Sequence, residues 1–167
     1  MMRQVLADKG DLVYKELVEA IESKNRQSIV SKGDQFLTMI LLQDSLLNNN
    51  LYFSLGRWIN QAQSFGKNLP DAKNVLYNAK SQITYWGPDY NSSTTLRDYA
   101  HKEWGGLLGS LYYERWKLFI DESLKGSLVP AKTFYDKEVN WSAQFDLYPM
   151  VKLENNVLQE LQRKILK

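Results

Sequence analysis

Cysteine is absent from the 167-residue sequence, and histidine occurs once, as His101. Without cysteine the chain can form no disulfide framework, no thiolate metal site and no cysteine nucleophile. A single histidine cannot build a zinc cage, and a serine–histidine–aspartate triad would depend on His101 alone. We therefore expect no metal site.

A strong charge of either sign is missing too, because 21 basic and 19 acidic side chains leave a net charge of only +2. This near-balance argues against a nucleic-acid-binding or polybasic membrane surface. No apolar run approaches the roughly 20 residues that a membrane helix needs. Met1-Met2 leads directly into mixed polar sequence, which is not the pattern of a signal peptide. We expect neither nucleic acid nor a membrane as a partner.

The apolar residues that are present recur near the 3.6-residue helical period, as in Val13, Leu17 and Ile21. Asn25 or Ser28 is a candidate cap for the second helix. The helical pattern continues in further segments, among them residues 51–65, 96–124 and 153–165. The breaks fall at Asn48-Asn49-Asn50, Gly66, Gly87-Pro88, Gly126 and Tyr148-Pro149. The pattern predicts one all-α domain over residues 1–167, a bundle of about six helices.

Three glycines, Gly105, Gly106 and Gly109, lie inside the expected helix 96–124. A glycine in a helix interior costs about 1 kcal/mol relative to alanine. We expect close approach of another backbone, or a kink, to compensate for this cost.

Acidic side chains give no clear catalytic pair. Glu16 and Glu19 share a helix with Lys15 and Lys24, which is typical of a solvated surface. Asp98 is suited to cap the helix that follows it.

Aromatic residues make up 13% of the chain, with five tryptophans and ten tyrosines. Most of them recur at helical spacing and are expected in the core. Trp86 differs because Gly87-Pro88 follows it, so the indole lies beside a loop, where binding residues concentrate. An exposed flat ring at this place suits the apolar face of a sugar.

Six short strings occur in a fixed order between residues 55 and 116, within a matching stretch that runs from about residue 51 to 149. They are Leu55-Gly56-Arg57-Trp58, Tyr77-Asn78-Ala79, Gln82-Ile83-Thr84-Tyr85-Trp86-Gly87-Pro88, Asp98-Tyr99-Ala100-His101-Lys102, Trp104-Gly105-Gly106-Leu107 and Tyr112-Tyr113-Glu114-Arg115-Trp116. In this order and spacing the chain resembles the C-terminal helical domain of the α-N-acetylglucosaminidases, a family of glycoside hydrolases.

The resemblance implies a multidomain parent enzyme in which this domain packs on a (β/α)8 barrel. The family resembles other retaining glycosidases, which use two carboxylates about 5–5.5 Å apart. In the family these carboxylates are two glutamates on the barrel. The resemblance therefore implies no catalytic residue in this chain, an inactive isolated domain and a reaction without a cofactor. The implied partners are the barrel and glycans ending in α-linked N-acetylglucosamine. The parent would be an exported, periplasmic or lysosomal protein.

The resemblance also suggests site residues. Trp86 is the first candidate for contact with substrate, and Leu96 is the second. The candidates for a structural or interface role are Arg57, Trp58, Asp98, Tyr99, Arg115 and Trp116. Two alternatives remain open, a stand-alone carbohydrate-binding module and a helical interaction domain. The interaction domain would bury Trp86 in its own core.

Overall fold

The computed structural model describes residues 2–86, 90, 102–144, 159–160 and 163–165. The elements in this part of the chain are α1 (Met2–Glu22), α2 (Arg26–Asn48), the 3-10 helix η1 (Leu51–Phe53), α3 (Leu55–Gly66), α4 (Ala72–Ser81), the π-helix η2 (Leu108–Tyr112), α5 (Tyr113–Leu124) and α6 (Ala131–Ala143). Residues 159–160 and 163–165 are helical as well, within the expected helix 153–165. These elements confirm the predicted all-α fold.

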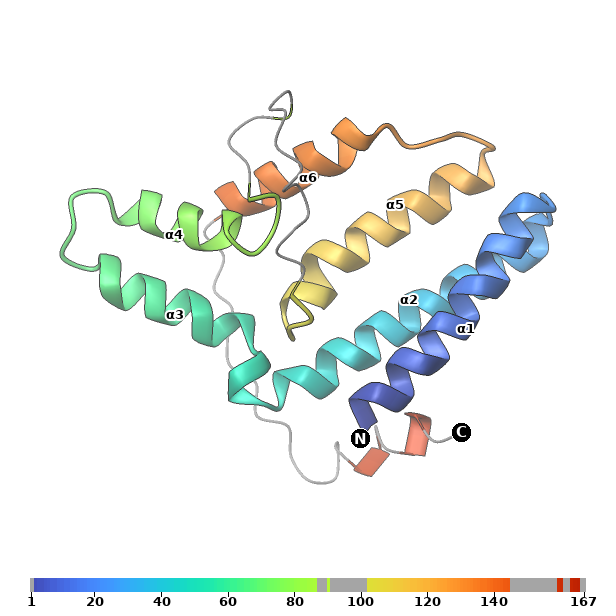
Figure 1. Cartoon of the computed structure of the whole chain (residues 1–167), viewed down its shortest axis with the longest axis horizontal. Helices are drawn as coiled ribbons and strands as arrows, with labels where there is room; N and C mark the ends of the chain where they lie inside the picture. Colours follow the sequence, from blue (N-terminus) through green and yellow to red (C-terminus); the bar gives the residue numbers. More distant parts are fainter. Residues whose placement is uncertain (1, 87–89, 91–101, 145–158, 161–162, 166–167) are drawn as a thin grey trace.

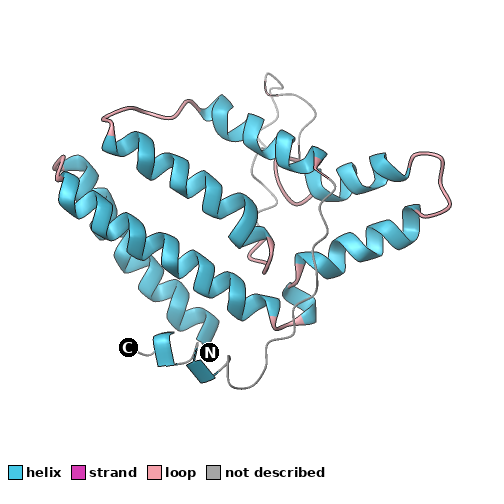
Figure 2. Ribbon diagram, turned by 180° about the vertical axis from the view of Figure 1, so that it is seen from behind, coloured by secondary structure: helices cyan, strands magenta, loops and turns pink. Residues whose placement is uncertain are grey.

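The helices form two arms joined by η2 and α5 (Figures 1 and 2). Helices α1 and α2 make an antiparallel hairpin, and α5 lies along α2. Helices α3 and α4 make a second hairpin, and α6 contacts α4. The Asn25 cap of α2 is as expected, because its side chain accepts a hydrogen bond from the Ser28 backbone at 3.1 Å.

In the described part of the chain the core has two hydrophobic clusters, one for each arm. The first joins α1, α2 and α5 through Leu17, Ala20, Ile29, Leu37 and Ile120. The second joins α3, α6, η2 and the turn after α4 through Leu55, Ile59, Ile83, Leu107, Leu111 and Trp141. The continuous run from η2 into α5 therefore connects the two clusters.

The predicted helix 96–124 is wrong in the part of residues 96–106 that the structure describes. Residues 102–104 are not helical, Gly105 forms a parallel β-bridge with Ser54, and the helix begins only at Leu107. The Leu55 N–H donates to the Gly105 carbonyl at 2.9 Å, and the Gly105 N–H donates to the Phe53 carbonyl at 2.8 Å. This bridge also divides the predicted helix 51–65 into η1 and α3.

The expected close approach at the glycines is present. A side chain at Gly105 would overlap the backbone nitrogen of Asn48, and a Cβ on Gly109 would lie 2.8 Å from the Asp44 carboxyl carbon. Gly106 has a φ of 88°, which an L-residue adopts only under strain. The glycines thus let the start of η2 rest directly on the end of α2.

Candidate functional site

Trp86 ends the irregular turn that follows α4. Its side chain is 48% exposed, so the indole is not part of the core. Its backbone N–H donates to the Ser81 carbonyl at 3.0 Å, which closes the turn. Its φ is 53°, a left-handed conformation that is a genuine outlier for a bulky side chain. Strain of this kind persists only where the surroundings enforce it, and it concentrates at functional sites.

Aromatic rings gather around the residue that precedes Trp86. Tyr85 is only 4% exposed, and its hydroxyl is hydrogen-bonded to the hydroxyl of Tyr77. Its ring meets Tyr135 of α6 edge-on at 5.3 Å, and Tyr135 meets Tyr90 at 5.5 Å. Burial, together with the bond to Tyr77, raises the pKa of Tyr85, so this phenol stays neutral. These contacts hold the residue before Trp86 in the core, so the exposed indole is attached to a buried neighbour.

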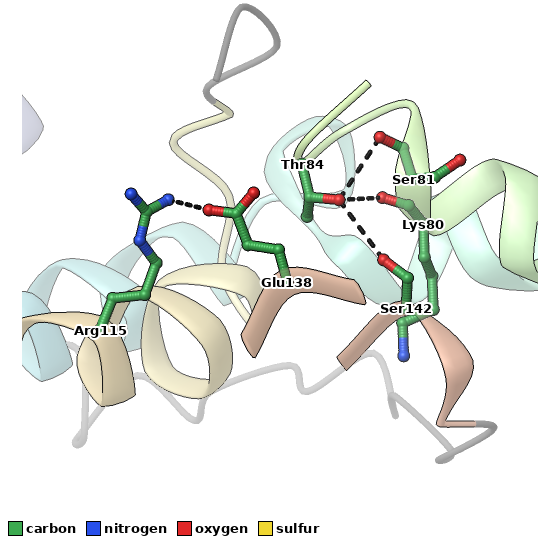
Figure 3. A network of polar contacts seen from close by, with 6 residues as sticks. All are labelled: Lys80, Ser81, Thr84, Arg115, Glu138 and Ser142. Atoms are coloured by element: carbon green, nitrogen blue, oxygen red, sulfur yellow. Dashed lines mark hydrogen bonds and ion pairs between the residues drawn. The ribbon is translucent and has the colours of Figure 1, made fainter. Parts of the chain in front are cut away.

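Arg115 of α5 holds a carboxylate in the core. Its guanidinium forms an ion pair with Glu138 of α6, whose side chain is 3% exposed (Figure 3). The same guanidinium lies 5.6 Å from the ring centre of Tyr112 and 5.4 Å from that of Phe134. Such a paired and stacked cation links α5 to α6.

Arg57 and Trp58 lie side by side on α3 but make different contacts. Arg57 stacks over Tyr52 of η1, 4.7 Å from the ring centre. The Trp58 indole N–H donates to the Ala79 carbonyl of α4 at 2.7 Å, which ties the two helices together.

Trp116 packs in the other arm, edge-on to Phe36 at 4.8 Å. It thus lies in the cluster of α1, α2 and α5. The remaining candidates, Leu96, Asp98 and Tyr99, lie outside the described residues.

Lys80 is a residue that the sequence analysis missed. It is 2% exposed although it carries a charge. Its Nζ donates to the Gln144 carbonyl at 2.8 Å and lies 4.0 Å from the Trp141 ring centre. The sequence did hold a signal, because Lys80 stands between Leu76 and Ile83 on an apolar stripe that runs from α4 into the turn after it.

The acidic residues of α1 face solvent or pair on the surface, as Glu16 does with Lys32 at 2.6 Å. Among the described residues, no three histidine, aspartate or glutamate side chains come together as metal ligands. In the same part of the chain, no helix combines the length and the apolar character that crossing a membrane requires.

Comparison with known proteins places this fold among glycoside hydrolases. A family 89 glycoside hydrolase from Clostridium perfringens, solved in complex with PUGNAc, is similar over 99% of this chain with a TM-score of 0.87 and 28% identity. A variant of the C. perfringens enzyme in complex with its substrate, GlcNAc-alpha-1,4-galactose, is similar with a TM-score of 0.86. In both cases the match spans 20% of the larger chain.

The alpha-N-acetylglucosaminidase C-terminal domain model matches residues 1–163, and the chain belongs to this family. It is also similar to human alpha-N-acetylglucosaminidase, with 31% identity over 144 residues. That alignment covers 83% of this chain but 19% of the human protein. The chain thus corresponds to about a fifth of the enzymes that it matches.

Proposed function

We propose that this domain packs against the catalytic barrel of an α-N-acetylglucosaminidase and that Trp86 lines the pocket for a terminal N-acetylglucosamine. The single observation that carries the proposal is Trp86 itself, half exposed and held at a φ of 53°. An indole that packed only for stability would be expected in the core and in a relaxed conformation. Family membership supports the choice of sugar, because the related C. perfringens enzyme is described with a GlcNAc substrate.

The exposed apolar residues of η1 support contact with a second surface. Leu51, Tyr52 and Phe53 are 51%, 72% and 39% exposed, three in succession. A patch of this kind commonly marks an interface. We place it in the contact with the barrel, where Arg57 holds Tyr52 in position.

The domain supplies part of the binding wall and the barrel supplies the chemistry. Retaining hydrolysis needs two carboxylates on either side of the glycosidic bond. The chain alone is therefore expected not to hydrolyse glycosides. Turnover of a chromogenic α-N-acetylglucosaminide by the pure chain would contradict this assignment.

A chimera tests the proposal. This chain replaces the matching segment of the C. perfringens enzyme, and hydrolysis of the chromogenic substrate is measured. We expect an active chimera in which Trp86→Ala raises KM about tenfold, the loss expected for one aromatic contact. Trp86→Phe should retain most of the affinity.

Phe65→Ala is the matched control, because Phe65 is an aromatic residue that is 74% exposed at the end of α3. It should leave KM unchanged. An active chimera in which Trp86→Ala changes KM no more than Phe65→Ala would contradict a role for Trp86 in binding.

A second candidate, a stand-alone carbohydrate-binding module, has one observation in its favour. A hollow of about 490 Å³ between η2 and α6 is lined by Trp141 and by polar side chains including Glu114, Lys137 and Asn140. Its size fits a sugar unit. Saturable binding of N-acetylglucosamine to the chain alone at low millimolar concentration, lost in Asn140→Ala but not in Trp86→Ala, would favour this candidate.

The helical interaction domain predicts an indole buried in the core. The 48% exposure of Trp86 does not agree with that expectation.

A further inference from the structure

The turn that carries Trp86 rests on polar side chains buried as deeply as the core. Lys80 and Thr84 are each 2% exposed, and Ser142 of α6 is not exposed at all. Burying polar groups is unfavourable unless each one is hydrogen-bonded. Two apolar side chains would fill the same space without the free-energy cost of burying polar groups. Stability alone therefore does not explain why hydroxyls are found here.

The hydroxyl of Thr84 is the centre of these contacts (Figure 3). Its Oγ1 donates to the Lys80 carbonyl at 2.9 Å and lies 3.4 Å from Ser142 Oγ. A threonine hydroxyl has one hydrogen to donate. Because the shorter bond to Lys80 takes that hydrogen, Ser142 donates to Thr84. The turn is thereby fastened both to the end of α4 and to α6.

The Lys80 ammonium fastens the same turn from the other side. It bonds to the carbonyl of Gln144, the residue that caps the C-terminus of α6, and lies on the face of Trp141. A cation at a helix C-terminus also interacts favourably with the helix dipole. Lys80 and Thr84 therefore link the end of α4 to Ser142, in the last turn of α6, and to Gln144, the C-cap of that helix.

Between these attachments the backbone makes consecutive tight turns. The N–H of Ile83 bonds to the Lys80 carbonyl and that of Thr84 to the Ser81 carbonyl, each at 3.2 Å. The turn ends with Tyr85 directed into the core and Trp86 directed outward in its left-handed conformation. A strained residue needs fixed anchors before it. Tyr85 is buried directly before Trp86, and Thr84, one residue earlier, is buried and hydrogen-bonded to Ser142 of α6.

We propose that Thr84, supported by Ser142 and Lys80, is a positioning residue that holds the Trp86 indole in its outward, left-handed conformation. This inference rests on the proposed function only for its effect on sugar affinity. The effect on the indole itself is a property of this chain alone.

The first test uses the chain labelled with 5-fluorotryptophan and measures ¹⁹F NMR. The Trp86 signal is assigned by its loss in Trp86→Phe, and the Trp116 signal, from the other arm, serves as the internal reference. Thr84→Val keeps the shape of the side chain and removes the hydroxyl, so we expect the Trp86 signal to shift or broaden. Thr84→Ser restores the hydroxyl and should restore the signal.

Ser45→Ala is the matched control. Ser45 Oγ also donates to a carbonyl four residues earlier, that of Leu41 at 2.9 Å, but on the exposed side of α2. It should leave the Trp86 signal unchanged. If Thr84→Val does not fold, Ser142→Ala is measured in its place with the same expected result.

If the Thr84 hydroxyl only stabilises the fold, the NMR experiment gives a different result. Thr84→Val would then lower the Tm while the Trp86 signal stayed at its wild-type position, and the inference would be overturned. The same variants in the chimera connect the position of the indole to affinity. We expect Thr84→Val to raise KM about threefold with little change in kcat, and Thr84→Ser to stay near wild type.

The two proposals can fail separately. If Trp86→Ala leaves KM unchanged in an active chimera while Thr84→Val moves the Trp86 signal, the sugar assignment fails and the positioning role stands. If Trp86→Ala raises KM and Thr84→Val leaves the signal unmoved, the positioning role fails alone.

Discussion

The carboxylate of Asp44, near the end of α2, accepts the backbone N–H of Gly109 at 2.7 Å. The same oxygen accepts the N–H of Gly106 at 2.6 Å, and Asn48 donates to the other oxygen at 3.1 Å. Asp44 thus caps the first turns of the η2–α5 helix from a different helix. This contact fixes the junction between the two arms of the fold.

Removing the Asp44 cap should lower the stability of the folded chain. Asp44→Ala leaves two partly buried N–H groups without their acceptor and should lower the free energy of unfolding by about 2–3 kcal/mol. Asp44→Asn keeps an acceptor oxygen and should lose less than half as much. Urea unfolding of the two variants checks the order, and equal losses would show that the contact with Gly106 and Gly109 does not depend on hydrogen bonding.

The charge of Asp44 should also show in the pH dependence of stability. Burial raises the pKa of this carboxyl above 3.8, and the bonds from Gly109 and Gly106 only partly oppose the shift. As the pH rises from 3.8, the unfolded chain loses this proton before the folded chain does, so the Asp44 contribution to stability falls. Asp44→Asn should remove that component, which unfolding curves across the acid range would reveal. A variant with the wild-type pH profile would contradict the assignment.

Because of Tyr85, the folded state should become less stable at alkaline pH. Burial raises the pKa of Tyr85 above the ordinary value of 10.0, so at higher pH the unfolded chain ionises first and the folded state is disfavoured. Tyr85→Phe cannot ionise at this position and should flatten the decline above pH 10.0. Thermal unfolding from neutral to alkaline pH measures the difference, with Tyr52→Phe as an exposed control.

Two glycines should respond to alanine in opposite directions. At Gly105 the new methyl would overlap the backbone of Asn48, so Gly105→Ala should cost about 3 kcal/mol or more. At Gly10, inside α1, a methyl would have no neighbour within 4 Å, and Gly10→Ala should stabilise the chain by about 0.5–1 kcal/mol. Paired Tm measurements check both signs, and a tolerated Gly105→Ala would contradict the close approach.

The strain at Trp86 can be measured without any sugar. Trp86→Ala removes the indole but keeps an L-residue at a φ of 53°, whereas Trp86→Gly also relieves the strain. The glycine variant should therefore be more stable than the alanine variant by about 1 kcal/mol. If alanine is the more stable of the two, the turn is not strained at this position.

The helical period of the apolar residues and the helix-breaking residues were sufficient to predict the helical fold and the Asn25 cap. Both depend on residues close together in the sequence. The same signals failed at residues 102–106, the described part of the segment 96–106. In the described part of that segment the Ser54–Gly105 bridge and the Asp44 cap decide where the helix begins. Both are contacts between distant parts of the chain, and the helical period holds no information about them.

The candidate site could be predicted in part from the sequence. The Gly87-Pro88 break marked Trp86 as a residue at a helix end, and the structure finds it half exposed. The buried set of Lys80, Thr84 and Ser142 was not predicted, because polar residues on an apolar stripe are inconspicuous until the facing helix is known.

The most direct test of the central claim is a crystal structure of the chimera with PUGNAc bound. It measures the shortest distance between the Trp86 indole and the sugar ring of the inhibitor. We predict carbon–carbon contact at about 4 Å, with the indole in its left-handed conformation. A bound inhibitor separated from the indole by bulk solvent would contradict the claim.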